Sequence, residues 1–147
     1  HLTKIRAKQQ IYRPILLKVS PDLTLDEATQ QVNLAMQFGL DGFVATNTTR
    51  SRDGLATERE QVEQIGNGGL SGKPLFQKSL RLVKHIATTT NGKLPIVGVG
   101  GIMTVEDALE MLNSGATLIQ VYTGFIYNGP CFVRQINKAI LRTNNII

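Results

Sequence analysis

The fold of this 147-residue chain is decided by the stretch PIVGVGGIMTVEDALEMLNSGATLIQVYTG, residues 95–124. It holds two short apolar runs rich in β-branched residues, at 95–99 and 118–121. Runs that are apolar on both faces are typical of strands buried inside a parallel sheet. Between them lies a helical pattern that Thr104 caps and Gly115 ends. The stretch therefore predicts a strand, a helix and a second, parallel strand.

The same cycle continues outward toward both ends of the chain. Further strands are predicted at 15–19 and 42–46. Helices are predicted at 2–10, from the Thr24 capping box to about Met36, from Phe76 to about Ala87, and from about Pro130 to Arg142. The order βαβαβαβα predicts an α/β fold with a parallel sheet and right-handed crossovers. We expect one domain over 1–147, with no second domain. The connection 47–75 is predicted as a long loop, and loops of that length tend to be functional.

Composition narrows the class of protein. The chain is 41% hydrophobic and 18% charged, which excludes collagen-like, low-complexity and disordered classes. No apolar run approaches the roughly 20 residues of a membrane span. A single cysteine, Cys131, excludes a disulfide framework and a cysteine-built zinc site, and it fits a reducing compartment. We expect Cys131 to serve packing. Because the chain begins at His1, we interpret it as a piece of a longer protein.

The net charge of +5 comes from one local tract. From Asp22, the first acidic residue, to the end of the chain, the positive and negative charges balance. The residues before Asp22 carry only positive charge. The tract consists of Lys4, Arg6, Lys8, Arg13 and Lys18. It contains a single aromatic residue, Tyr12, and no nucleic-acid motif. We therefore interpret it as a solvated helix end and expect no nucleic-acid partner.

Glycine or polar residues follow each predicted strand. In parallel α/β folds, ligands bind beyond the carboxyl ends of the strands. Gly100 and Gly101 allow close backbone approach and precede a helix N-terminus, which favours a phosphate. Tyr122 and Thr123 recur one unit later, and loops after the last two strands form the common phosphate site of (β/α)8 barrels. The alternative for the glycines is a tight turn that requires positive φ.

The other two strand ends offer different chemistry. Lys18 would place a cation near a bound anion or an electron-rich ring, unless it is a surface lysine that extends from the sheet into water. Thr46, Asn47 and Thr48 offer neutral donors and acceptors that suit a heterocycle bearing an amide or a carboxylate, unless they only form a turn. The glycine-rich end of the long loop, around Ser71, would form a lid or a backbone cradle, unless it is simply flexible.

No general base is evident at the strand ends. His85 is predicted on a solvated helix face, and Asp22 and Asp41 are interpreted as turn residues. Paired carboxylates, a Ser-His-Asp set and a His-rich metal site are not found there. Hydride or electron transfer by a bound cofactor fits a site that binds and orients a substrate without supplying a base.

Together these residues resemble the dihydroorotate dehydrogenases, specifically the class 2, quinone-linked type. The matching blocks are LLKVSPDL at 16–23, ATNTT at 45–49, GGLSGKPL at 68–75, PIVGVGGI at 95–102 and VYTG at 121–124. The resemblance implies an FMN-containing (β/α)8 TIM barrel that oxidises dihydroorotate to orotate in pyrimidine synthesis. The chain resembles only the carboxyl-terminal half of that barrel, about four βα units with strands five to eight.

The resemblance also implies roles for individual residues. FMN would be bound by Lys18, Thr46, Ser71, Gly72, Gly100, Gly101, Tyr122 and Thr123, the last four at its phosphate. Orotate would be bound by Asn47 and Thr48. The family's catalytic serine base belongs to the half that has no counterpart here. The resemblance therefore implies no catalytic residue and no metal in this chain, and an isolated chain that is inactive.

Class 2 enzymes are peripheral membrane proteins that use a quinone. They lie on the inner face of the bacterial cytoplasmic membrane or on the mitochondrial inner membrane, through an N-terminal helical segment that we expect to be absent here, so the chain itself is expected to be soluble. Half of an eight-stranded barrel has two open edges, so we expect pairing with the missing half or with a second copy. The apolar residues expected at an unfilled interior are Ile15, Leu17, Val44, Ile96, Val97, Ile119 and Val121.

Three other interpretations stay open. The chain could come from another flavin barrel, such as a class 1 dihydroorotate or a dihydropyrimidine dehydrogenase, although the SPDL and TNTT blocks favour class 2. It could come from a phosphate-binding isomerase barrel without redox chemistry, against which Lys18 and Asn47 argue weakly. It could also be a half-barrel that serves as an assembly module without catalysis.

Overall fold

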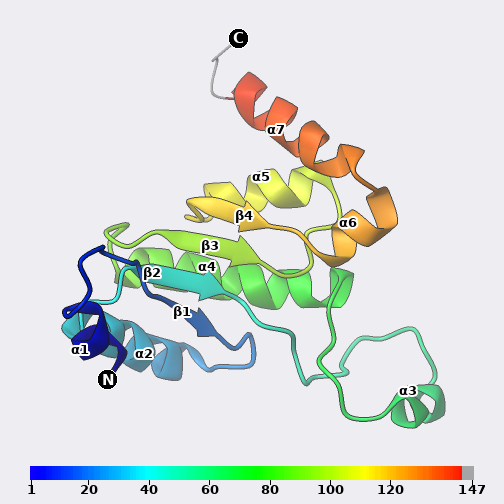
Figure 1. The fold of residues 1–147 in the computed structure, drawn as a ribbon. Helices are drawn as coiled ribbons and strands as arrows, with labels where there is room; N and C mark the ends of the chain where they lie inside the picture. Colours follow the sequence, from blue (N-terminus) through cyan, green and yellow to red (C-terminus); the bar gives the residue numbers. More distant parts are fainter. Residues whose placement is uncertain (144–147) are drawn as a thin grey trace.

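Four short parallel strands form the centre of the molecule (Figure 1). The computed structural model describes residues 1–143. The strands are β1 Leu16–Val19, β2 Gly42–Ala45, β3 Ile96–Val99 and β4 Leu118–Gln120. They lie in the order β1-β2-β3-β4, each parallel to its neighbour. The predicted α/β fold with a parallel sheet is therefore confirmed, while the last four residues of the expected domain 1–147 lie outside the described residues.

The main helices alternate with these strands along the chain. They are α2 Leu25–Gln37, α4 Phe76–Thr89, α5 Val105–Asn113 and α7 Cys131–Thr143. In α2 and α5 the threonine side chain before the helix accepts a hydrogen bond from the amide three residues on, and the acidic side chain at that position accepts one from the threonine amide. Such a capping box satisfies amides that have no acceptor within the helix. Local sequence thus fixes where both helices begin.

Several local predictions need correction. The first helix is shorter than the predicted 2–10. The predicted loop 47–75 contains helical turns, because REQVEQI consists mostly of good helix formers. The predicted last helix, from about Pro130 to Arg142, is confirmed as α7, but a further short helix that was not predicted precedes it, and Gly129, with a φ of 72°, separates the two. The elements concerned are α1 Leu2–Arg6, α3 Arg59–Ile65, the 3-10 helix η1 Lys73–Leu75 and α6 Thr123–Asn128.

The two faces of the sheet differ in what covers them. Side chains alternate along a strand, and parallel register places Phe43 beside Ile96 on one face. Both are fully or almost fully buried and belong to one apolar core with residues of α2, α4, α5 and α7. The opposite face carries Leu16 and Leu118, whose residues are 37% and 62% exposed. Within residues 1–143 the helices thus cover one face and leave the other open (Figure 1).

The prediction of which apolar residues face an unfilled interior is therefore partly wrong. Only Val44 and Val97, which pair across β2 and β3, lie on the open face. Ile96 is 1% exposed in the helix-covered core. The alternation also assigns Leu17, Ile119 and Val121 to the covered face, where they pack against that core. A run that is apolar on both faces gives no sign in the sequence of which residues point which way.

This arrangement is that of half a (β/α)8 barrel. A doubly wound sheet places helices on both faces and reverses its strand order at one point. Here the strands follow one another in sequence order, and helices lie on one side only. A (β/α)8 barrel has that order, with its helices outside. Among residues 1–143, no helix has the length and apolar character that a bilayer crossing requires.

The basic tract before β1 is not simply a solvated helix end. Arg6 lies over the ring of Tyr12, with its guanidinium carbon 4.9 Å from the ring centre. Both side chains donate to the carboxylate of Asp41, which also accepts from the Ile15 amide at 2.6 Å. The Tyr12 hydroxyl, the Ile15 amide and Arg6 hold the pKa of Asp41 below its ordinary value, although burial opposes them. Asp41 thus fastens the N-terminal segment beside the start of β2, and its interpretation as a turn residue before that strand was incomplete.

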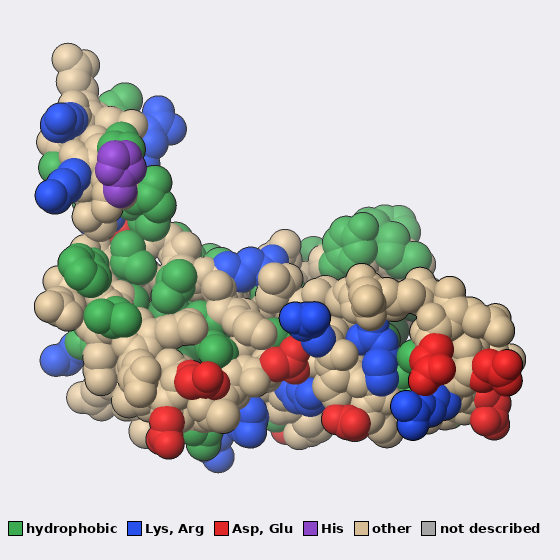
Figure 2. Space-filling view, turned by 90° about the horizontal axis from the view of Figure 1, so that it is seen from below, with side chains coloured by type: hydrophobic (Ala, Val, Ile, Leu, Met, Phe, Trp, Pro, Cys, Tyr) green, Lys and Arg blue, Asp and Glu red, His purple; other side chains and the backbone are tan. Residues whose placement is uncertain are grey.

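Charge elsewhere is mixed. On the face of the molecule shown in Figure 2, acidic and basic side chains are interspersed, with no single basic stripe. A nucleic-acid surface shows its basic residues clustered on one face or along one helix. This face therefore gives no support to a nucleic-acid partner.

The open sheet generates a first prediction. Within the described residues, β1 and β4 each pair with one strand only, and unpaired edges are templates for further strands. Produced alone, the 147 residues should associate with a second copy or with a complementary half-barrel. Light scattering over a dilution series checks this, and Leu118→Lys on the open face should weaken the association. A cooperative, compact monomer at every concentration would contradict it.

Candidate functional site

One cavity of about 220 Å³ lies at the carboxyl ends of the four strands. It is formed by Lys18 within β1, by residues at or after the ends of β2, β3 and β4, by the end of the long loop and by the start of α6. All ten predicted binding residues line it, namely Lys18, Thr46, Asn47, Thr48, Ser71, Gly72, Gly100, Gly101, Tyr122 and Thr123. Apolar contributions come from Leu75, Val99, Ile102 and Val121. The structure thus brings together residues that the sequence spreads over more than a hundred positions.

The glycines after β3 are required by the packing of the chain itself. Gly100 and Gly101 have φ values of 118° and 77°, which favour glycine. A Cβ on Gly101 would lie 2.3 Å from the backbone nitrogen of Phe76, and a Cβ on Gly100 would lie 2.4 Å from the Ser79 hydroxyl. The tight-turn alternative therefore accounts for both glycines without a ligand. Their effect is to hold the β3–α5 loop against the first turn of α4.

The turn after β2 is held by backbone bonds on both sides. The Thr46 amide donates to the Val99 carbonyl at 2.7 Å, and the Asn47 amide donates to the Val19 carbonyl at 2.8 Å. Thr46 is only 2% exposed, whereas Asn47 and Thr48 are exposed at the cavity. The Asn47 side-chain oxygen accepts from the Thr48 amide at 3.0 Å. The turn is therefore fixed between β1 and β3 while its next two residues face the cavity.

The long loop returns to the cavity and closes its rim. The hydroxyls of Ser71 and Thr123 lie 2.9 Å apart, which joins the loop to the start of α6. A Cβ on Gly72, whose φ is 80°, would meet the Thr123 methyl group at 3.2 Å. A Cβ on Gly69 would lie 1.9 Å from the Thr48 hydroxyl. Glycine at these positions lets the loop pass directly beside the candidate ligand-binding hydroxyls.

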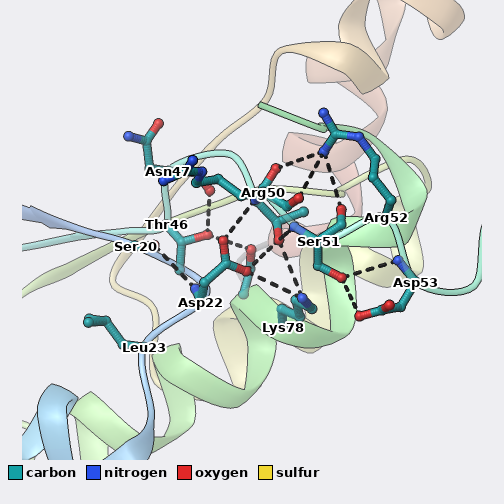
Figure 3. A network of polar contacts seen from close by, with 12 residues as sticks. Ser20, Asp22, Leu23, Thr46, Asn47, Arg50, Ser51, Arg52, Asp53 and Lys78 are labelled. Carbon is teal, nitrogen blue, oxygen red and sulfur yellow. Dashed lines mark hydrogen bonds and ion pairs between the residues drawn. The ribbon is translucent and has the colours of Figure 1, made fainter. Parts of the chain in front are cut away.

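Asp22, after β1, anchors the chain that follows β2 (Figure 3). Its carboxylate accepts from the hydroxyl of Thr49, from the amide of Arg50 at 2.8 Å and from the ammonium of Lys78 at 3.3 Å. Burial pushes the pKa of Asp22 up, but the bonds from Arg50, Thr49 and Lys78 outweigh it, so the pKa lies below the ordinary 3.8. The interpretation of Asp22 as a turn residue was therefore incomplete. Nothing in the sequence pairs it with a threonine 27 positions away.

Residues 50–69 form an excursion that is closed at its base. Thr49 and Leu70 exchange backbone hydrogen bonds of 3.1 and 2.8 Å. Next to them Arg52 donates to the Gly68 carbonyl, where the loop returns toward the site, and also to the Ser51 carbonyl at 3.3 Å. Figure 3 shows its guanidinium turned back toward the carbonyls of Arg50 and Ser51. The two ends of the loop are thus bonded to each other where it leaves and rejoins the site. The alternative that the loop is simply flexible does not account for these bonds.

Two side chains outside the cavity depart from prediction. His85 is partly buried rather than solvated, and its Nε2 lies 2.8 Å from the Thr29 hydroxyl, which joins α4 to α2. Cys131 is exposed at the first position of α7, so the expected packing role is wrong. Neither residue lines the cavity.

The chemistry of the cavity is that of binding and orientation. Of its lining residues only Lys18 and Tyr122 are ionisable, and no Asp, Glu, His or Cys lies among them. The remaining polar groups are neutral hydroxyls, the two side-chain amides of Asn47 and Gln120, and backbone groups of glycine-containing loops. The amides of the first turn of α6 have no acceptor within their own helix. This set can hold an anion beside a planar, partly apolar group, and it offers no carboxylate or imidazole as a general base.

Comparison with known proteins gives consistent results. The family model for dihydroorotate dehydrogenase matches residues 1–143. A dihydroorotate dehydrogenase (quinone) of Thermobifida fusca (strain YX) is 46% identical over 127 residues, which is 86% of this chain and 34% of the relative. The protein of the same name from Christiangramia forsetii is 44% identical over 140 residues, 95% of this chain and 40% of the relative.

Solved structures agree with the sequence comparison. The crystal structure of DHODH from Eimeria tenella in complex with ferulenol superposes with a TM-score of 0.81 at 38% identity, covering 93% of this chain and 36% of that chain. The ligand-free form from the same organism gives 0.79 at 37% identity, covering 88% and 35%. This chain thus spans between about a third and two fifths of the length of these relatives. The half-barrel architecture is confirmed by the likeness.

The Asp22 anchor generates a prediction with a defined pH dependence. A carboxylate whose pKa is depressed in the fold contributes stability above its ordinary pKa and loses it as pH falls through the folded value. Asp22→Asn should therefore lower the free energy of unfolding at neutral pH by roughly 1 to 2 kcal/mol, a modest figure because its side chain is 30% exposed. The difference should shrink as pH falls below the ordinary 3.8.

Denaturant unfolding at several pH values measures this. Glu110→Gln, on an exposed position of α5, serves as the control and should change little. Equal stability of Asp22→Asn and the wild type at neutral pH would mean that the anchor contributes nothing.

Proposed function

The chain belongs to the dihydroorotate dehydrogenase family, and from this premise we propose that it forms the carboxyl-terminal half of the barrel in a quinone-linked enzyme that oxidises dihydroorotate to orotate in pyrimidine synthesis. The observation that carries the proposal is the convergence of all ten predicted residues on one cavity beyond the strands. Ligands of (β/α)8 barrels bind at that end. Relatives that are 44 to 46% identical to this chain over the aligned residues are named dihydroorotate dehydrogenase (quinone).

The cavity fits FMN by the chemistry of its lining. The loop of Gly100 and Gly101 and the first turn of α6, at Thr123, would hold the phosphate, since backbone N–H groups there suit an anion. Val99, Val121 and Leu75 supply apolar surface for a flat ring system. When bound, the flavin would supply the acceptor for the hydride. Lys18 would place its positive charge beside the flavin, which Thr46, Ser71 and Gly72 would border, while Tyr122 would lie at the phosphate with Thr123.

Asn47 and Thr48 are the proposed substrate groups. Both are exposed at the cavity on a turn that backbone bonds hold between β1 and β3. The Asn47 oxygen is already used by the Thr48 amide at 3.0 Å, so the Asn47 amide hydrogens would point toward an acceptor such as a carboxylate or a ring carbonyl. The two residues orient the dihydropyrimidine ring, and neither carries a group that removes a proton at neutral pH.

The proton must leave through a base outside this chain. No Asp, Glu, His or Cys lines the cavity among the described residues. We propose that the rest of the barrel supplies the base, and that the isolated chain does not oxidise dihydroorotate. We likewise propose that the quinone, and attachment to the bacterial cytoplasmic or the mitochondrial inner membrane, belong to the complete enzyme. Its partners would then be dihydroorotate, orotate and a quinone.

The alternatives differ in what they predict. A barrel isomerase would bind a phosphate ester but no flavin, so a complete enzyme without flavin absorption would favour it. A class 1 or dihydropyrimidine enzyme would bind FMN but would not reduce a quinone with dihydroorotate as donor. An assembly module would bind neither ligand.

Lys18 generates the test for the cofactor. In the complete enzyme, Lys18→Met should weaken FMN binding by about tenfold or more, because a charge-assisted hydrogen bond contributes roughly 1.5 to 3 kcal/mol. Equilibrium dialysis with flavin fluorescence measures the dissociation constant. Lys93→Met is the matched control, since Lys93 is exposed and precedes β3 at the opposite end of the sheet. Unchanged FMN affinity in Lys18→Met would remove Lys18 from the flavin site.

Asn47 generates the test for the substrate. Asn47→Ala should raise the dissociation constant of orotate by roughly 5- to 100-fold with FMN still bound, because unpaired polar groups of the ligand cost about 1 to 3 kcal/mol each. Titration of the flavin absorbance with orotate measures it. Asn33→Ala, on an exposed face of α2, should bind orotate normally. If Asn47→Ala also binds orotate with normal affinity, Asn47 only forms a turn.

A further inference from the structure

Ser79 is a buried polar side chain with no role in the functions proposed so far. It lies in the first turn of α4 and is completely buried, on a face whose other buried members are Phe76, Leu82, Val83 and Ile86. A hydroxyl in such surroundings is costly unless it is hydrogen-bonded. The hydrogen-bond partner of the Ser79 hydroxyl therefore indicates its structural role.

The partner is the turn after β2. The Ser79 hydroxyl oxygen lies 2.7 Å from the hydroxyl oxygen of Thr46. Thr46 donates its own hydrogen to the carbonyl of Asn47 at 2.9 Å. Because a hydroxyl has one hydrogen, Thr46 must accept from Ser79. A directed chain of two hydrogen bonds thus runs from α4 through Thr46 to the backbone of Asn47.

The same hydroxyl also contacts the neighbouring loop. A Cβ built on Gly100 would lie 2.4 Å from the Ser79 oxygen, so this oxygen lies directly beneath the loop after β3. One side chain behind the cavity therefore touches both the turn that presents Asn47 and Thr48 and the loop assigned to the phosphate. Ser79 itself does not line the cavity.

We propose that Ser79 is a positioning residue for ligand binding. Through Thr46 it fixes the orientation of the peptide that carries Asn47, and thereby the direction in which the Asn47 side chain leaves the turn. It acts from behind the site and touches no ligand. This inference rests on the proposed function, because it gives Ser79 a role in the same orotate site.

The experiment uses the complete enzyme with FMN bound and compares two variants that each remove one buried hydroxyl. Ser79→Ala breaks the chain to Asn47. Thr90→Val is the matched control, because Thr90 is 1% exposed and, within residues 1–143, its hydroxyl bonds only to carbonyls of α4, at Ile86 and Ala87. Both should lower the melting temperature. Only Ser79→Ala should raise the dissociation constant of orotate, by about three- to tenfold, the worth of one neutral hydrogen bond.

A second variant keeps the test decisive if Ser79→Ala folds poorly. Thr46→Val interrupts the same chain at its middle and should weaken orotate binding by a similar factor. In the double variant the two effects should not add, since both remove one interaction. Ser79→Cys, which keeps a weak donor, should recover part of the affinity.

The outcomes separate the inference from the proposed function. A wild-type enzyme that binds neither FMN nor orotate would defeat the proposed function itself. A wild type that binds both, with orotate affinity unchanged in Ser79→Ala, would overturn the inference alone. An equal loss in Ser79→Ala and Thr90→Val, or additive effects with Thr46→Val, would also overturn it, because Ser79 would then act only through stability or by another route.

Discussion

Parallel pairing of four successive strands is the constraint on which the rest of the structure depends. Because every strand runs in the same direction, the residues that follow all four strands arrive at one edge of the sheet. The backbone bonds of Thr46 to Val99 and of Asn47 to Val19 continue that pairing one step beyond the strands. Residues far apart in the chain meet at the cavity for this reason alone, before any side chain contributes.

Around that edge, the loops are held by contacts that differ in kind. The glycines of the β3–α5 loop allow the backbone to lie against α4, where any Cβ would collide. Asp22 holds the chain after β2 through a carboxylate, and Ser71 joins the long loop to α6 through a hydroxyl. Each loop is thus held by contacts within the protein, which leaves Lys18 and Asn47 at the cavity. A site whose binding groups are already oriented loses less conformational entropy when a ligand binds.

The sequence predicted what depends on local pattern. The strands and the capping boxes of Thr24 and Thr104 were predicted within a residue or two, because each depends on neighbours in the chain. The cavity residues were predicted because strand ends converge in any parallel sheet. Pairs such as Asp22 with Thr49, Arg6 with Asp41 and Ser79 with Thr46 were missed, since lone polar residues dozens of positions apart leave no periodicity. The direction of side chains in uniformly apolar strands was missed because nothing local encodes it.

The bonded base of the 50–69 excursion has a consequence for the insertion of additional sequence into this protein. Since Thr49 and Leu70 are bonded to each other and Arg52 spans to Gly68, the two ends of the excursion are held together independently of its length. Lengthening a loop whose ends are already joined costs little, about 0.6 kcal/mol for each doubling. The tip around Gly54, which is exposed and free of close neighbours, is therefore a natural point of insertion. A reporter domain or an epitope inserted there would lie at the molecular surface and leave the ligand site unchanged.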